Sequence, residues 1–180
     1  MDNAQKAIMI GVGLFITIII ISSVLLISNM GTNLITSAQS QLSGITKGLQ
    51  NQITAAYDGK TLTGAEVIAA FQQYESSDMS IVVKVGTGTP ATTGKYNLTW
   101  ANIKTDKTSG SEPANSTSYP GGVYYNGTYT EFAANARTTL TKLQATAGGY
   151  GVNASKTFYS SVIKDTVTDT VVGILFVQRG

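Results

Sequence analysis

The most pronounced pattern along the chain is an apolar run near the N-terminus, from Ala7 to Ser28. Fourteen of its residues are Ile, Leu, Val or Phe, and its polar side chains are the hydroxyls of Thr17, Ser22, Ser23 and Ser28. A helix over this run would be about 33 Å long, enough to cross a bilayer core. The apolar side chains favour insertion by about 4 to 8 kcal/mol in total. The run is therefore predicted to be a membrane-seeking helix.

The polar stretch that follows keeps a helical periodicity. Apolar residues recur at steps of three and four, with Ser, Thr, Gln and Asn at most of the other positions. This stripe consists of Ile35, Ala38, Leu42, Ile45 and Leu49. The first strong stop signal is Asp58-Gly59. The sequence thus predicts one helix from about Asn3 to Tyr57, with Gly31 as a candidate bend.

No charged residue occurs between Lys6 and Lys47. A helix exposed to water normally carries Lys and Glu on its outer face, whereas a helix buried among its own copies does not. The lone cation at the N-terminal flank favours an N-terminus on the inner side of the membrane. Gly44 and Gly48 form a GxxxG step, which would allow close approach of helices.

The chain resembles a type IV pilin, because its long helix has an apolar first half and an amphipathic second half and is followed by a small head. The segment MDNAQKAIMIGVGLFITIIIISSVLLISN is most similar to the pilin-like proteins of tight-adherence pilus systems in Gram-positive bacteria. The resemblance implies a structural subunit of an extracellular filament for cell adhesion. It also implies insertion in the cytoplasmic membrane before assembly. The implied partners are many copies of the same chain in a helical polymer and the assembly machinery in the membrane.

The resemblance assigns the apolar residues of the first half to the membrane helix and the filament core. These residues are Ile8, Ile10, Gly11, Gly13, Leu14, Phe15, Ile16, Ile18, Ile19, Ile20, Ile21, Val24, Leu25, Leu26 and Ile27. Asp2 and Lys6 are candidates for a contact that sets subunit registration at the N-terminus. The usual type IV pilin has a glutamate near the processing site, but this chain has no Glu before Glu66.

Two alternatives to the filament subunit have to be considered. One is a bitopic exoprotein (a minor pilin, an assembly factor or a binding module) that stays in the membrane and does not polymerise. The other is a cleaved signal peptide, against which the length of the apolar run counts, because such regions extend to about 15 residues.

Residues 58–180 are predicted to form one globular α+β head with an antiparallel sheet and one or two helices. Thr63 and Glu66 form a capping box that predicts a helix starting at Gly64. Strands are expected at 80–85 and 96–100, a hairpin at Asn126-Gly127, and a C-terminal hairpin around 165–169. The segment 130–147 is ambiguous between helix and loop. The polar segment 105–122 is expected to be an irregular surface insertion.

The composition argues against most kinds of catalytic, metal-binding and nucleic-acid-binding site. The chain has no Cys and no His, which excludes disulfides, histidine acid–base catalysis and the common zinc sites. Asp165 and Asp169 are the closest acidic pair and are expected to serve a turn rather than to bind calcium. A net charge of +2 is too small for a nucleic-acid interface. We therefore expect no enzyme and no cofactor.

The head also contains four sequons for N-linked glycosylation. They begin at Asn97, Asn115, Asn126 and Asn153. A chain rich in Ser and Thr contains some sequons by chance, so these sites depend on a host that glycosylates exported proteins.

Overall fold

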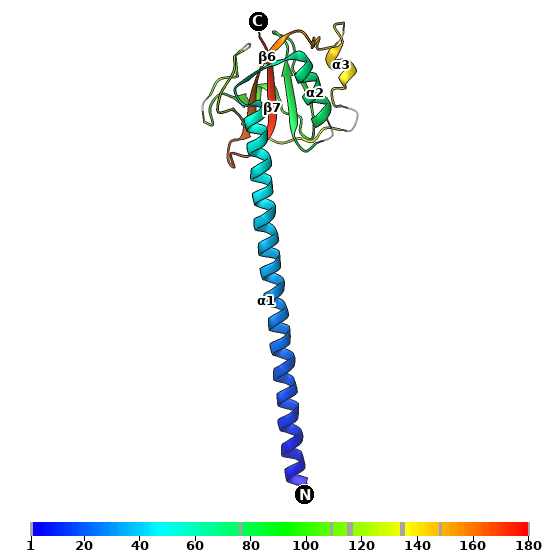
Figure 1. Ribbon diagram of the computed structural model, residues 1–180, viewed down its shortest axis with the longest axis vertical. Coiled ribbons are helices and arrows are strands. Elements are labelled where there is room, and N and C mark those ends of the chain that lie inside the picture. The colour runs from blue at the N-terminus through cyan, green and yellow to red at the C-terminus, as the bar shows by residue number, and fades with distance from the viewer. Residues whose placement is uncertain are drawn as a thin grey trace. The chain divides into compact units, whose positions relative to one another are not determined.

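The computed structural model describes residues 2–75, 77–108, 110–114, 117–133, 136–147 and 149–179. Helix α1 extends without interruption from Asp2 to Tyr57, through Gly31 (Figure 1). The predicted long N-terminal helix is thereby confirmed. The chain divides into two compact units, Met1–Gly48 and Leu49–Gly180, so the last turns of α1 belong to the head unit.

The head combines short helices with strands, in agreement with the predicted α+β class. In chain order the elements are β1 (Lys60–Thr63), α2 (Gly64–Tyr74), β2 (Ser80–Lys84), β3 (Ala91–Thr93), the 3-10 helix η1 (Trp100–Asn102), β4 (Ile103–Lys104), β5 (Val123–Tyr125), α3 (Leu140–Gln144), β6 (Thr157–Asp165) and β7 (Val171–Gln178).

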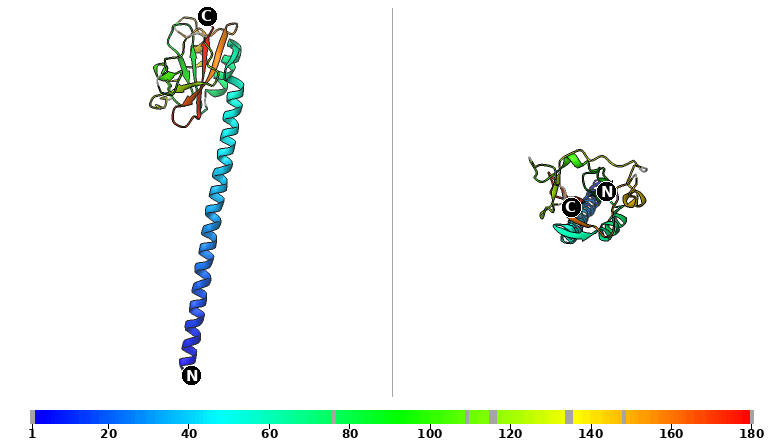
Figure 2. Two further views of the ribbon diagram at one scale, coloured as in Figure 1. Left: turned by 90° about the vertical axis from the view of Figure 1, so that its left-hand side faces the viewer. Right: turned by 90° about the horizontal axis from the view of Figure 1, so that it is seen from above.

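The strands of the described residues form one curled sheet in the order β3-β2-β7-β6-β5-β4, with β1 pairing with β6 (Figure 2). The sheet is mixed, because β2 is parallel to β7 and β5 is parallel to β6. The prediction of an antiparallel sheet is therefore correct only for the pairs β1–β6, β2–β3, β4–β5 and β6–β7. The cause is the position of the C-terminal β6–β7 hairpin, which lies between β2 and β5 and meets each of these strands in parallel orientation.

Both faces of the sheet are covered. On one face, the end of α1 and helices α2 and α3 enclose a core that includes Ile53, Phe71 and Phe176. On the other face, the chain between β3 and β6 encloses a second core around Leu98 and Tyr125. Double coverage explains why β2 and most of β7 are buried along their length rather than alternating between buried and exposed positions.

Several local predictions are confirmed. Thr63 and Glu66 make the reciprocal hydrogen bonds of a capping box, and α2 begins at Gly64. Strand β2 occupies most of the predicted 80–85 segment, and β6 and β7 form the predicted antiparallel C-terminal hairpin. Within the ambiguous 130–147 segment, the short α3 is the helix that the described residues form.

Two predictions in the middle of the chain were wrong. Segment 96–100 is not a strand: Tyr96 forms an isolated bridge with Glu131, and Trp100 begins η1. Asn126-Gly127 does not join two strands. Instead the Asn126 amide donates to the carbonyl of Asn102, and β5 pairs with β4 and β6.

Candidate functional site: the N-terminal helix and its junction with the head

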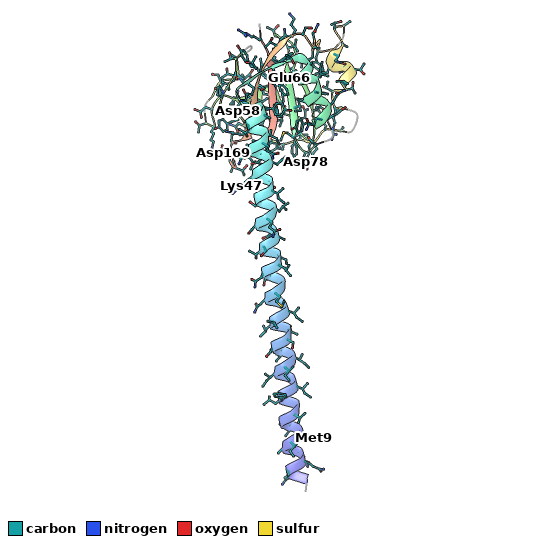
Figure 3. The ribbon with its side chains drawn as sticks, viewed as in Figure 1. Met9, Lys47, Asp58, Glu66, Asp78 and Asp169 are labelled. Carbon is teal, nitrogen blue, oxygen red and sulfur yellow. The ribbon has the colours of Figure 1, made fainter. Side chains whose placement is uncertain are left out.

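The predicted core residues of α1 all lie on one continuous helix and are exposed to solvent. The exposed fraction of its large apolar side chains within 8–27 ranges from 48% at Ile19 to 74% at Met9. Side chains project to both sides of the helix between Met9 and Lys47 in the view of Figure 3. By length and composition, α1 is able to cross a membrane. Asp2 and Lys6 are in its first turns, and the side chain of Asp2 lies outside the described residues.

Two of the four hydroxyl groups of the apolar run make hydrogen bonds that suit a dry environment. Thr17 donates to the carbonyl of Gly13 at 2.8 Å, and Ser23 donates to that of Ile19 at 2.8 Å. Both bonds connect positions four apart in the helix, so these donors are satisfied within α1 itself. Their cost of transfer out of water is correspondingly lower.

The glycines of α1 leave open space beside the backbone. A Cβ atom added at Gly11, Gly13, Gly44 or Gly48 would meet no atom within 4 Å. None of these glycines is therefore required by packing within the chain. Such bare positions allow another helix to approach closely.

The last turns of α1 are fixed in the head. Ile53 is buried in the core that α2 and α3 cover, and the Tyr57 ring packs edge-on against Tyr74 and Phe176, with centroids 6.1 and 5.9 Å away. The carbonyl of Tyr57 accepts a hydrogen bond from the Ser160 hydroxyl on β6. The sequence identified Tyr57 only as the end of a helix. Its partners could not be predicted, because Ser160 and Phe176 lie more than a hundred residues further along the chain and Tyr74 lies on another helix.

Asp58 ends the helix and also holds two other segments. Its carboxylate accepts hydrogen bonds from the backbone amides of Gly121 at 2.7 Å and Val162 at 3.3 Å. Gly59 follows with φ +65°, a conformation that favours glycine. The turn predicted from Asp58-Gly59 therefore also joins α1 to the centre of the sheet.

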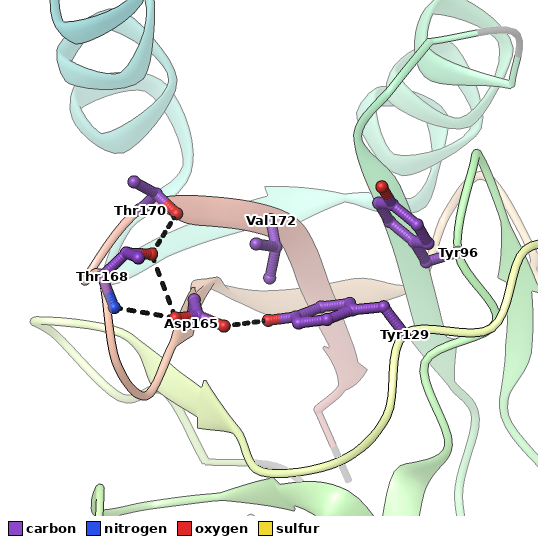
Figure 4. Close-up of a pocket in the computed structure, with 6 residues that line it drawn as sticks. All are labelled: Tyr96, Tyr129, Asp165, Thr168, Thr170 and Val172. Carbon is purple, nitrogen blue, oxygen red and sulfur yellow. Dashed lines mark hydrogen bonds between the residues drawn. The ribbon is translucent and has the colours of Figure 1, made fainter.

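A hollow of about 230 Å³ lies at the turn between β6 and β7 (Figure 4). Tyr129 donates to Asp165 at 2.6 Å, and the Thr168 amide donates to the other carboxylate oxygen at 2.7 Å. These bonds lower the pKa of Asp165 to about 2, and burial together with the bond to Asp165 raises the pKa of Tyr129. Tyr129, Asp165, Thr168 and Thr170 are thus bonded to one another, and these bonds stabilise the turn.

The remaining predicted site residues also belong to the head. Asp169 pairs with Lys107 and has φ +56°, and no group of three metal-ligating side chains occurs among the described residues. Asn97, Asn126 and Asn153 are exposed, whereas Asn115 lies outside the described residues.

Comparison of the chain with protein families, with curated proteins and with solved structures finds no match.

Proposed function

We propose that this chain is the structural subunit of an extracellular filament of the type IV pilus kind. In this proposal α1 is inserted in the cytoplasmic membrane before assembly and packs against α1 of neighbouring copies afterwards. The head forms the outer surface and contacts other cells or materials. The carrying observation is a helix whose apolar and uncharged side chains are exposed over dozens of consecutive positions.

The apolar first half supports the membrane step. Burying a side chain such as Ile or Leu contributes about 1.5 to 3 kcal/mol relative to leaving it in water. The exposed side chains of α1 between 8 and 27 therefore require either lipid or protein around them. A membrane supplies the first environment, and a bundle of identical helices supplies the second.

The second half of α1 supports polymerisation over a simple anchor. Leu42, Ile45 and Leu49 are 57–69% exposed, and no charge occurs between Lys6 and Lys47 to keep this part of the helix in water. A stalk that only connects an anchor to a head gains nothing from this composition. A helix enclosed by its copies gains burial of the stripe and avoids burying charges.

The junction of α1 with the head supports a mechanical role. Tyr57 and Asp58 connect the end of the helix to β6 and to the loop at Gly121. Tension on α1 would therefore be distributed over the central strands rather than over one flexible linker.

The deciding experiment places a charge in the polar half of α1. Leu42→Lys lies beyond the apolar run and in an exposed position, so membrane insertion and head folding should be retained. A filament subunit should lose assembly at least tenfold, because an unpaired buried charge costs several kcal/mol. Shearing of cells, followed by electron microscopy and quantification of released subunit, measures this.

Leu42→Met is the matched control and should assemble normally. If Leu42→Lys released as much fibre as the control, the segment would not be buried between subunits. If the unmodified protein stayed with the membrane pellet after shearing, the bitopic exoprotein would be the better description.

A further inference from the structure

The head contains a second hollow, of about 470 Å³, that the proposed filament function does not use. Three segments that are separate in the sequence meet there: the turn before β3, the segment leading into η1, and the long loop at Glu112. The residues that line it are Thr89, Pro90, Thr92, Asn97, Leu98, Thr99, Trp100, Ala101 and Glu112.

The aromatic wall of this hollow is the single tryptophan of the chain, Trp100. Its indole is half-buried and packs against the core around Leu98. Lys84 lies 4.9 Å from the ring centroid, and its ammonium group donates to the carbonyl of Gly88 at 2.6 Å. The indole is thus held by the core and by a cation, while part of its surface faces the hollow.

Three polar side chains near the indole are free to bind a ligand. Asn97, Thr99 and Glu112 are exposed, and within the described part of the chain their side chains make no hydrogen bond or ion pair. They offer an amide, a hydroxyl and a carboxylate, which together supply donors and several acceptors. The hollow near Asp165 differs in this respect, because the side chains of Tyr129, Asp165, Thr168 and Thr170 there are bonded to one another.

The charges of the lining argue for a neutral ligand. Glu112 is the one carboxylate among the lining residues, which is too few for a metal ion. An anion would face this carboxylate, and the nearest described cation to the indole, Lys84, is buried and does not line the hollow. A flat apolar ring surface beside uncommitted hydroxyl, amide and carboxylate groups suits a polyol with one C–H face and several hydroxyls.

We propose that this hollow binds a neutral saccharide. The apolar face of a sugar ring packs against Trp100, and the ring hydroxyls bond to Asn97, Thr99 and Glu112. This activity belongs to the head of a single subunit and does not depend on filament assembly.

The single tryptophan makes the test direct, because its fluorescence reports on this hollow alone. The full chain is purified in a detergent without a sugar headgroup, from a host that does not glycosylate asparagine. Chitotriose, maltotriose, cellotriose and lactose are titrated separately. We expect a saturable change in tryptophan fluorescence with at least one of them, with a Kd of about 0.1 to 10 mM.

The same titration at low and high salt should give the same Kd, because the ligand is uncharged. A flat response to every sugar up to about 50 mM would overturn the proposal. A response that weakens strongly with salt would also contradict it, since that behaviour indicates recognition of charge.

Two exposed variants test the assignment of residues without disturbing the core. Glu112→Ala and Asn97→Ala should each weaken binding about tenfold, the effect expected for loss of a good hydrogen bond. Glu131→Ala removes an exposed carboxylate outside this hollow and should leave the Kd unchanged. If the first two variants bound as the control does, the sugar would bind elsewhere and the assignment would be wrong.

Discussion

At the scale of single residues, Asp165 illustrates how a polar side chain organises a turn. Its carboxylate accepts bonds from the amides of Val167 and Thr168 and from the hydroxyl of Tyr129. The sequence suggested a role in the β6–β7 turn, and the structure adds the tyrosine that fastens this turn to another part of the head. That partner is 36 residues away in the sequence.

The pKa of Asp165 gives a pH dependence with a definite sign. Because folding lowers this pKa from 3.8 to about 2, the ionised carboxylate contributes stability above pH 4 to 5. That contribution should be lost as the pH falls through about 4 towards 2. We expect Asp165→Asn to lower the free energy of unfolding at pH 7 by about 1 kcal/mol, since partial exposure reduces the effect.

Denaturant unfolding of wild type and variant between pH 7 and pH 2 measures this difference. The gap in the free energy of unfolding should narrow as the pH decreases. Asp106→Asn, on an exposed loop position, is the control and should show no comparable gap. An Asp165→Asn variant as stable as wild type at pH 7 would show that the carboxylate contributes nothing.

At the scale of elements, the long loop between β4 and β5 is fixed at several points, although its described residues form no helix or strand. The Thr105 amide donates to the carbonyl of Ser111, the Ala114 amide donates to the Tyr119 hydroxyl, and Pro113 is buried. Most of its other described residues are exposed or half-buried, as expected for a surface insertion. Loops of this kind on a rigid scaffold commonly carry recognition.

Replacing Ser109–Ser118 by a short Gly-Ser linker should therefore leave filament assembly intact and change adhesion or antibody binding. The replacement also removes Glu112, so saccharide binding by the head should weaken as well. Fibre yield after shearing measures assembly, and an adhesion assay measures the change in adhesion. Loss of fibres, or an unfolded head by circular dichroism, would mean that the loop is structural, for example a bridge between subunits.

At the scale of the whole molecule, the proposed filament function depends on what surrounds α1. The central apolar residue Ile20 is 57% exposed in the single chain. In a filament it would be enclosed by neighbouring helices, and Ile20→Lys should abolish assembly because the charge has no partner there. Ile20→Leu should assemble like wild type.

Lysine at this position also disfavours membrane insertion by about 3 kcal/mol. The amount of each variant in the membrane fraction is therefore measured beside the amount of fibre released by shearing. Wild-type quantities of fibre from Ile20→Lys would contradict a spine made of this segment.

Many such subunits in one fibre would also repeat the saccharide site. Weak binding at each head would then be strengthened by multivalency, provided that neighbouring sites reach the same surface. Millimolar affinity for a single head is compatible with firm adhesion of a fibre.

The sequence by itself determined the features that rest on local patterns. The apolar run and the absence of charge fix α1, and Thr63 with Glu66 fixes the start of α2, because each depends on neighbours within a few residues. The C-terminal hairpin belongs to the same class, since β6 and β7 are joined by a short turn.

Only the tertiary structure decided which distant segments meet. The parallel pairing of β2 with β7 could not be predicted, because strands buried on both faces read as continuous apolar runs that do not specify a partner. The hairpin predicted at Asn126-Gly127 does not form, because β5 pairs with β4 and β6 and not with the residues after Gly127. The Trp100 hollow and the anchoring of Asp58 arise in the same way, from contacts whose free energy becomes available only after the chain has closed long loops.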